Sequence, residues 1–317
     1  MLTINKAAKT KKKSLSPEKK KRGKIMFLLI LPFLILNFLF AYFPLHGWIY
    51  AFFDYKPPLS LLQCDFVGFQ WFTMLFSNPT QLSQLAQVMI NTFAMSLLGM
   101  ATSILPLLFA VFLSEIKTKW FKSTVQTLTT LPNFISWVLV YSIAFALFST
   151  TGMVNTFLQN KGITNEAIKF LDSDNHTWLS MMLWNLWKTL GWNAIMYLAA
   201  ISSIDPGLYE AAEIDGAGRF RLMRYITIPA LLPTFFVLLM LSIANFLNNG
   251  MDQYFVFQNA FNKSHIQVLD LYVYNIGITG RSLSLATAIS MMKSLVSVTL
   301  LIIVNAASKK VRGESII

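Results

Sequence analysis

Cysteine is almost absent from this chain of 317 residues, since Cys64 is the only one. A single cysteine excludes an internal disulfide and a metal cluster built on cysteines. The three histidines are far apart and lack ligand spacing, so we expect no metal site. No Gly-x-x-x-x-Gly-Lys-Ser/Thr sequence occurs, so we expect this chain to bind no ATP and no other cofactor. No pair of nucleophile and general base stands out either, and we expect no enzymatic activity and no catalytic residue.

Charged residues are also scarce, at 13%, whereas 55% of the residues are hydrophobic. Soluble domains carry about 25% charged residues, so most of this chain is predicted to lie in a lipid bilayer. The net charge of +12 comes largely from residues 1–24, which hold ten Lys and Arg. A basic block before an apolar segment is an orientation signal that also attracts anionic lipids, and we do not expect nucleic-acid binding. The apolar segment is too long for a cleaved signal peptide, so we expect an uncleaved first span.

Long hydrophobic runs are plentiful. A transmembrane helix needs about 20 mostly apolar residues. Six segments meet this requirement, and we predict an all-α, polytopic membrane protein with spans at Ile25 to about Pro44, Val88–Leu113, Ser123–Phe148, Trp178–Ile201, Ile228–Leu247 and Leu283–Ala307.

Lys and Arg are distributed unevenly between these spans. With the N-terminus inside, the inner segments hold ten, three, three and three, nineteen in all. The outer loops hold one, two and two. Because positive residues favour the cytoplasmic side, both termini are predicted to be cytoplasmic, in the cell membrane. The predicted organisation is a basic cytoplasmic tail at 1–24, a six-helix domain at 25–307 with an inner loop at 202–228, and a cytoplasmic tail at 308–317.

The inner loop at 202–228 has a readable local structure. Asp205 followed by Pro206 is typical of a helix start, with an N-cap residue and then proline in the first turn. Gly216 and Gly218 can end that helix and allow a reversal of the chain. A second amphipathic piece follows, and Pro229 marks the entry to the fifth span. The sequence therefore predicts a compact helix–turn–helix, although an ordinary loop of interfacial helices fits these residues equally well.

The same loop resembles the signature of permeases from binding-protein-dependent ABC importers. That signature is Glu-Ala-Ala, three residues, Gly, nine residues, Ile, one residue, Leu-Pro. It is matched here by Glu210, Ala211, Ala212, Gly216, Ile226 and Pro229, with Asp215 in the fuller string and Ile228 in place of the usual Leu. Two further stretches, Gly250–Phe257 and Val268–Tyr274, and the C-terminal Gly313-Glu314 are similar to the branch that imports oligosaccharides, of the maltose-permease type.

The resemblance implies a fold, a mechanism and partners. It implies the type I ABC importer permease fold, paired with a second, non-identical permease. Two ATP-binding subunits would hold ATP and Mg, and the helix from Glu210 to Gly216 would dock on one of them. An extracytoplasmic solute-binding protein would deliver an oligosaccharide. ATP-driven closure would then rock the spans between inward-open and outward-open states.

The fourth predicted span has an unusual composition for a helix that faces lipid. Within ten residues it carries three tryptophans, two asparagines and a lysine, and a charge at the bilayer centre is costly unless it faces a polar interior. Tryptophan and asparagine offer ring stacking and hydrogen bonds, which sugars require. We therefore predict substrate-pathway residues at Trp184, Asn185, Trp187, Lys188, Trp192 and Asn193. The alternative is that the tryptophans form an interfacial belt or pack between helices.

Lys293 in the sixth span is a further candidate for the pathway. It could meet an acidic sugar, pair with a partner subunit or extend to the interface. Asn245, Asn248 and Asn249 could line the outer mouth, although a simple helix end fits them better. Three alternatives remain open. The first is an ABC permease for amino acids, phosphate or polyamines. The second is an ion-coupled secondary transporter, which would need a buried carboxylate that none of the six spans contains. The third is a membrane scaffold that transports nothing, which would leave Lys188 unexplained.

Overall fold

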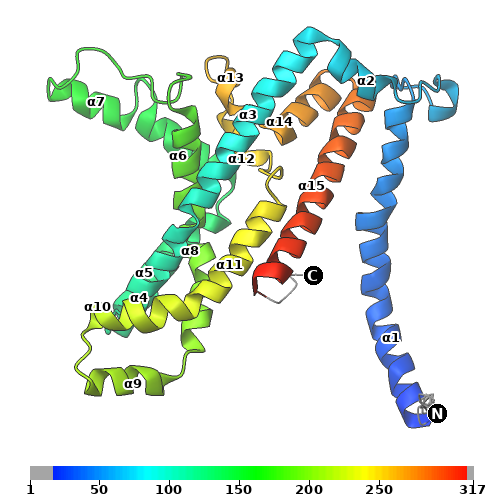
Figure 1. The fold of residues 1–317 in the computed structure, drawn as a ribbon. Coiled ribbons are helices and arrows are strands. Elements are labelled where there is room, and N and C mark those ends of the chain that lie inside the picture. The colour runs from blue at the N-terminus through cyan, green and yellow to red at the C-terminus, as the bar shows by residue number, and fades with distance from the viewer. Residues whose placement is uncertain (1–16, 313–317) are drawn as a thin grey trace, which may run out of the picture. The chain divides into compact units, whose positions relative to one another are not determined.

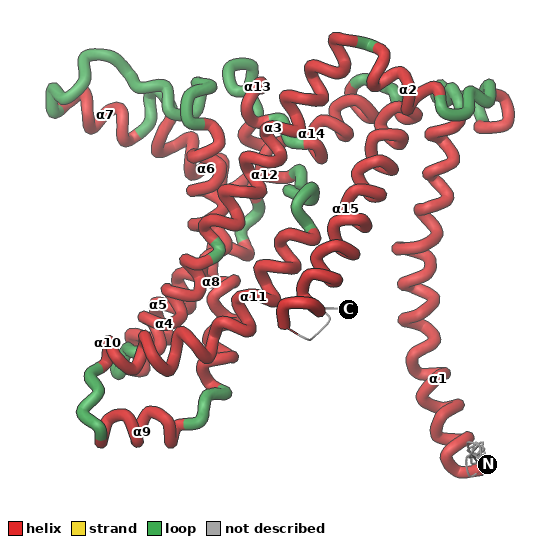
Figure 2. The backbone as a smooth tube through the Cα atoms, viewed as in Figure 1, coloured by secondary structure: helices red, strands yellow, loops and turns green. Residues whose placement is uncertain are grey.

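The computed structural model describes residues 17–312, and this part of the chain is helical throughout apart from its loops (Figure 2). Its only strand-like pairing is an isolated bridge between Phe53 and Phe66. The predicted all-α class is therefore confirmed for the described residues. The chain divides into two compact units, Met1–Ile49 and Tyr50–Ile317.

The first unit contains the long apolar helix that follows the basic N-terminal block. Helix α1 spans Pro17–Asn37, continues as a π-helical turn, η1, at Phe38–Tyr42, and passes into the 3₁₀ helix η2, Phe43–Phe52. Its side chains from Ile25 onward are mostly exposed, as expected for a helix whose neighbour is lipid. Lys11, Lys12 and Lys13 of the basic block lie outside the described residues.

The second unit holds the other helices (Figure 1). Its α-helices are α2 (Gln70–Ser77), α3 (Pro79–Thr102), α4 (Ile104–Ser114), α5 (Lys119–Thr130), α6 (Trp137–Phe148), α7 (Met153–Asn160), α8 (Thr177–Ser202), α9 (Pro206–Ile214), α10 (Arg219–Leu222), α11 (Ile228–Ala244), α12 (Asp252–Phe257), α13 (Lys263–Ile266), α14 (Leu269–Tyr274) and α15 (Leu283–Arg312). Short 3₁₀ or π segments interrupt them at η3 (Leu61–Gln63), η4 (Leu131–Phe134), η5 (Met223–Thr227) and η6 (Asn275–Thr279).

Five helical segments among the described residues are long and apolar enough to cross a bilayer. They are Lys21–Phe52, Pro79–Ser114, Trp137–Asn160, Arg219–Ala244 and Leu283–Ala306. The predicted fourth span, α8, has 26 residues and is therefore about 39 Å long. It is long enough to cross, but its tryptophans, asparagines and lysine lower its apolar content. The number of six spans therefore stays a prediction.

The third predicted span, Ser123–Phe148, is not one continuous helix. It is broken into α5, the 3₁₀ turn η4 and α6, and the chain is extended at Ile135 and Ser136. Pro132 lies in the break, where it removes a backbone donor, and Ser136 caps α6 by accepting a hydrogen bond from the Leu139 amide. The second span is similarly divided at Ser103, between α3 and α4.

Helix α8 is the centre of the packing in the second unit. Helices α3, α4, α5 and α11 all pack against it, and α11 also packs against α15. Buried side chains from α4, α8 and α11 form one core, which includes Leu107, Val111, Ala194, Tyr197 and Leu231. A second core joins α3, α6 and α8 to the segment 251–271. Because α8 is surrounded on several sides, Lys188 near its middle is buried.

One close backbone contact fixes α5 against α8. A Cβ atom added at Gly191 would lie 2.4 Å from the carbonyl carbon and oxygen of Thr129, far inside contact distance. Only glycine allows the two helices to approach this closely. Gly191 therefore sets the position of α5.

Candidate coupling loop and substrate pathway

Helix α9 begins as its sequence predicts. Asp205 has extended dihedral angles, and its side chain accepts a hydrogen bond from the amide of Gly207 at 2.9 Å. Pro206 occupies the first turn. After Ile214 the chain turns at Gly216, whose φ of +78° is in the region that favours glycine. The predicted helix and turn are thus both present.

The second half of the predicted helix–turn–helix is joined directly to a membrane segment. Helix α10 starts at Arg219 and runs through the π-helical turn η5 into α11 without a break, and Pro229 lies in the first turn of α11. Ile226 is half-buried within η5. Movement of α10 must therefore be passed on to α11.

Helix α9 buries none of its residues. Glu210, Ala211, Asp215 and Gly216 are exposed, and Ala212 is half-buried. Two large apolar residues also face outward, since Leu208 is 54% and Ile214 87% exposed. In Figure 1, α9 is at one end of the second unit, connected to α8 and α10 by short loops. An exposed apolar surface on a loop rich in charge is typical of a protein interaction site.

One side-chain contact connects α9 to η5, which leads into the predicted fifth span. The hydroxyl of Tyr209 shares a hydrogen bond with the hydroxyl of Thr227 at 3.0 Å, across 18 residues of sequence. Thr227 is 1% exposed and is the last residue of η5. Sequence reasoning did not single out Tyr209, because nothing in the loop indicates which residue of the next helix it would reach.

Lys188, predicted in the substrate pathway, is engaged by the protein itself. Its ammonium donates to the carbonyl oxygens of Pro132, Asn133 and Ile135 at 3.0, 2.8 and 2.6 Å. It lies 5.5 Å from the centre of the Trp137 ring and is 7% exposed. These carbonyls lie at the break between α5 and α6, where the helical hydrogen-bond pattern is interrupted. The Pro132 oxygen also accepts a hydrogen bond from the Ile135 amide at 3.2 Å, and Lys188 supplies a charged donor to all three oxygens.

The three predicted tryptophans of α8 face different surroundings. Trp184 makes edge contacts with Trp187 and Phe148, and all three line a cavity of about 290 Å³ together with Phe170. Trp192, further along α8, makes an edge contact with Phe134 at 5.6 Å. The structure thus does not bring the three rings into one cluster.

The predicted asparagines of α8 also separate. Asn185 is exposed, whereas Asn193 lines a cavity of about 310 Å³ between α4, α8 and α11. Tyr197, Ser242 and Asn245 line the same cavity. Sequence reasoning missed Tyr197 and Ser242. The polar residues of α8 and those at the end of α11 are about fifty residues apart, and only the packing of the two helices brings them together.

Lys293 forms an ion pair with Asp270. The second carboxylate oxygen of Asp270 accepts a hydrogen bond from the amide of Gly250 at 3.0 Å, and Gly250 has a φ of +76°. The two stretches that resemble the oligosaccharide branch therefore meet at one carboxylate. Gln253 of the first stretch is 6% exposed and donates to the carbonyl of Met181 in α8. The Gly313-Glu314 pair lies outside the described residues.

The chain belongs to the family described as "Binding-protein-dependent transport system inner membrane component", whose sequence pattern matches residues 102–313. It is therefore a multi-pass membrane protein of a transport system. Protein LplB of Bacillus subtilis is 37% identical over 298 residues, which cover 93% of this chain and 92% of that protein.

Two further likenesses concern proteins with named cargo. The polygalacturonan/rhamnogalacturonan transport system permease protein YteP of Bacillus subtilis is 37% identical over 302 residues, covering 92% of this chain and 90% of YteP. A crystal structure of a bacterial ABC transporter involved in the import of the acidic polysaccharide alginate shares 30% identity, with a TM-score of 0.81. The match covers 93% of this chain and 98% of that one, so the chain has the type I ABC permease fold.

Proposed function

We propose that this chain is one permease subunit of an ATP-driven importer of oligosaccharides, and that α9 couples it to the ATPase. The observation that carries the proposal is the exposure of α9 and of the turn after it, which display Glu210, Ala211 and Gly216 between two membrane segments. A helix that buries none of its residues, yet is tied at both ends to membrane helices, fits a docking element. Membership of a binding-protein-dependent transport family supports the same reading.

The proposed arrangement has six spans with both termini in the cytoplasm. The bias of Lys and Arg toward the inner segments supports this orientation. Helix α8 would be the remaining span, because it is long enough to cross a bilayer and its only charged residue, Lys188, is buried among neighbouring helices.

Four kinds of partner follow from the proposal. A second permease would complete the pathway, and two ATP-binding subunits would carry ATP and Mg, since this chain has no phosphate-binding loop of its own. A solute-binding protein on the outer side would deliver the cargo, in keeping with the family description. The fourth is the oligosaccharide itself.

The cargo is proposed from the relatives and from the chemistry of α8. YteP is named for polysaccharide transport and the solved neighbour imports alginate. The cavity at Asn193 supplies amide and hydroxyl groups, which suit the hydroxyls of a sugar. Lys188 and Lys293 are both engaged within the chain, so we do not assign them the recognition of an acidic cargo.

The coupling role is tested by ATP hydrolysis in the assembled importer with its loaded binding protein. Glu210→Gln and Gly216→Val are expected to remove most of the stimulation of hydrolysis by the binding protein. Glu115→Gln, which removes the same charge from another inner segment, serves as the matched control and is expected to keep it. Full stimulation in both α9 variants would contradict the proposal.

A second measurement concerns the cargo. Hydrolysis by the unchanged importer is measured with binding protein and short oligosaccharides from alginate, from polygalacturonan or from maltodextrin. Stimulation by any of these supports oligosaccharide cargo and identifies its class. Stimulation only by amino acids, phosphate or polyamines would overturn it.

A further inference from the structure

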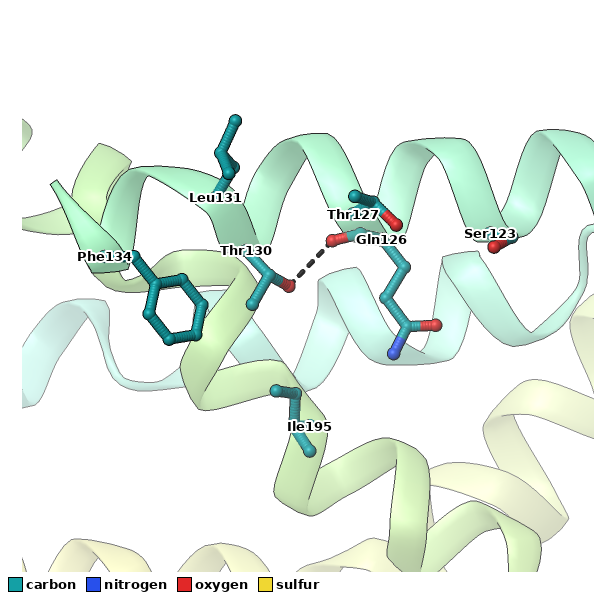
Figure 3. A pocket seen from close by; sticks show the side chains of 7 residues that line it. All are labelled: Ser123, Gln126, Thr127, Thr130, Leu131, Phe134 and Ile195. Atoms are coloured by element: carbon teal, nitrogen blue, oxygen red, sulfur yellow. Dashed lines mark hydrogen bonds between the residues drawn. The ribbon is translucent and has the colours of Figure 1, made fainter.

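A cavity of about 400 Å³ lies between α5, η4 and α8 (Figure 3). It is lined by Ser123, Gln126, Thr127, Thr130, Leu131, Phe134 and Ile195. It does not include the α8 residues Trp184 and Asn193, which line other cavities. The function proposed above makes no use of it.

The polar residues of this cavity form one stripe on α5. Ser123, Gln126, Thr127 and Thr130 are spaced by three, one and three residues, which places them on the same side of a helix. We call these four residues the α5 polar face. Figure 3 shows Gln126 and Thr130 projecting toward the side on which Ile195 of α8 lies. Leu128, which does not line the cavity, is 62% exposed.

Three of these side chains are available for an outside partner. Thr130 donates to the carbonyl of Gln126 at 2.7 Å and is satisfied within the helix. Within residues 17–312, the side chains of Ser123, Gln126 and Thr127 make no hydrogen bond. A free amide offers two donors and an acceptor, and leaving these in contact with lipid is unfavourable. The α5 polar face therefore requires water or a polar ligand.

One aromatic ring, that of Phe134, lines the same cavity, and the ring of Trp192 contacts it. Phe134 is 71% exposed and lies at the end of the α5 polar face. Its ring makes an edge contact with the ring of Trp192, which is 47% exposed. Neutral amide and hydroxyl groups beside accessible ring faces match the two sides of a sugar, its hydroxyls and its apolar C–H face. No charged residue lines the cavity among the described residues.

Contacts within the chain hold the walls of the cavity in place before any ligand binds. Lys188 binds three carbonyls around η4 and so holds the turn that carries Phe134. The contact of Gly191 with Thr129 fixes α5 beside α8. A site that is formed before its ligand arrives loses less entropy on binding.

We propose that the α5 polar face, with Phe134 and Trp192, is a saccharide subsite in the cytoplasmic half of the translocation pathway. It rests on the proposed function, which supplies the orientation: α5 starts at Lys119, within the predicted inner segment between the second and third spans, and ends at the break in the third span. The subsite contacts the hydroxyls and the apolar C–H faces of the cargo on its way to the cytoplasm. The competing occupant is the second permease, packed dry against the same face.

Cysteine labelling distinguishes these occupants in the assembled importer. In a Cys64→Ser background, Gln126→Cys and the control Leu128→Cys are treated with a hydrophilic maleimide in inside-out vesicles. Thiols react as thiolates, which form where water has access. We expect Gln126→Cys to react roughly tenfold faster or more than Leu128→Cys. An unreactive Gln126→Cys would overturn the proposal in favour of a dry interface between subunits.

Protection by sugar tests the ligand. Short oligogalacturonides and maltooligosaccharides are added to the same vesicles, whose bath faces the cytoplasmic side. Slower labelling of Gln126→Cys with either sugar, but not of Leu128→Cys, supports the subsite. Fast labelling that neither sugar slows would overturn it, leaving a water-filled vestibule.

Transport supplies a second readout. Gln126→Leu keeps the volume but removes the hydrogen bonds, and we expect uptake to fall on the order of tenfold. Normal uptake by Gln126→Leu would contradict a role in cargo binding. A failure of the proposed coupling role is recognised separately. In that case Glu210→Gln would keep full stimulation of ATP hydrolysis by the binding protein, whatever the labelling rate of Gln126→Cys.

Discussion

Lys188 illustrates how a buried cation can serve the backbone. A lysine in the middle of a membrane helix indicates a polar partner, and a ligand is one such partner. Here the partners are three carbonyls at the break between α5 and α6. The role of Lys188 in the pathway stays a prediction, and a single substitution separates the two roles.

Lys188→Met keeps an unbranched side chain only one atom shorter and removes the donors of the ammonium group. If the lysine supports η4, three carbonyls lose a charged donor, and we expect destabilisation of about 3 kcal/mol or more. Thermal unfolding of the purified importer in detergent measures this. Lys169→Met, at an exposed position, is the control and is expected to change little. Normal stability of Lys188→Met combined with lost uptake would favour the pathway role instead.

The close contact between Gly191 and the Thr129 backbone leads to a second prediction about stability. Gly191→Ala places a methyl group against the Thr129 backbone, so α5 must move, and we expect a loss of stability of a few kcal/mol. The matched control is Gly99→Ala, also within a helix, whose added Cβ would meet nothing within 4 Å. The control is expected to be neutral or to stabilise by up to about 1 kcal/mol. Equal stability of the two variants in thermal unfolding would contradict the close contact.

At the scale of elements, the strongest local signals were sufficient for prediction. Asp205 and Pro206 mark the start of α9, and Gly216 marks its turn, because caps and turns depend on a few adjacent residues. The long span α8 was also predicted within one residue at each end. Hydrophobic runs locate a membrane helix well.

The break in the third span could not be predicted in the same way. The run Ser123–Phe148 is apolar enough to be read as one helix, and Pro132 alone does not show where the carbonyls at the break find donors. Lys188 satisfies them from more than fifty residues away. The cavity shared by Asn193 and Asn245 likewise depends on the packing of α8 on α11, which neither sequence segment contains.

The link between α9 and α11 yields a prediction at this scale. Tyr209→Phe removes the hydrogen bond to Thr227 but keeps the ring, so α9 is held less firmly to η5. We expect ATP hydrolysis to continue while uptake per ATP falls several-fold. Tyr225→Phe, at a residue 70% exposed in the same region, is the control and should keep normal uptake. An unchanged ratio of uptake to hydrolysis in Tyr209→Phe would show that this contact does not transmit movement.

For the whole molecule, the proposed orientation can be measured with thiols. Cys64 is half-buried in a loop between the first and second spans, and Ile214 is 87% exposed on α9. An impermeant maleimide should label Cys64 in intact cells. With Cys64→Ser as background, Ile214→Cys should be labelled only after the membrane is opened. Labelling of Ile214→Cys in intact cells, and of Cys64 only in opened membranes, would show that the orientation is the reverse of the proposed one.

The hydrogen bonds from Lys188 to the carbonyls around η4 also have a consequence for how the protein inserts into the membrane during synthesis. Helix α8 alone would carry an unpaired cation into the bilayer, which costs about 3 kcal/mol or more on insertion scales. Its acceptors lie on the segment made just before it, so we expect the two segments to leave the translocon as a hairpin. Glycosylation mapping of nascent chains tests this: α8 should insert efficiently behind residues 119–148 and poorly behind an unrelated apolar helix. Membrane insertion would then depend on the order in which the segments are synthesised. The carbonyls at the break in the third span would already be present to accept hydrogen bonds from Lys188 when α8 emerges.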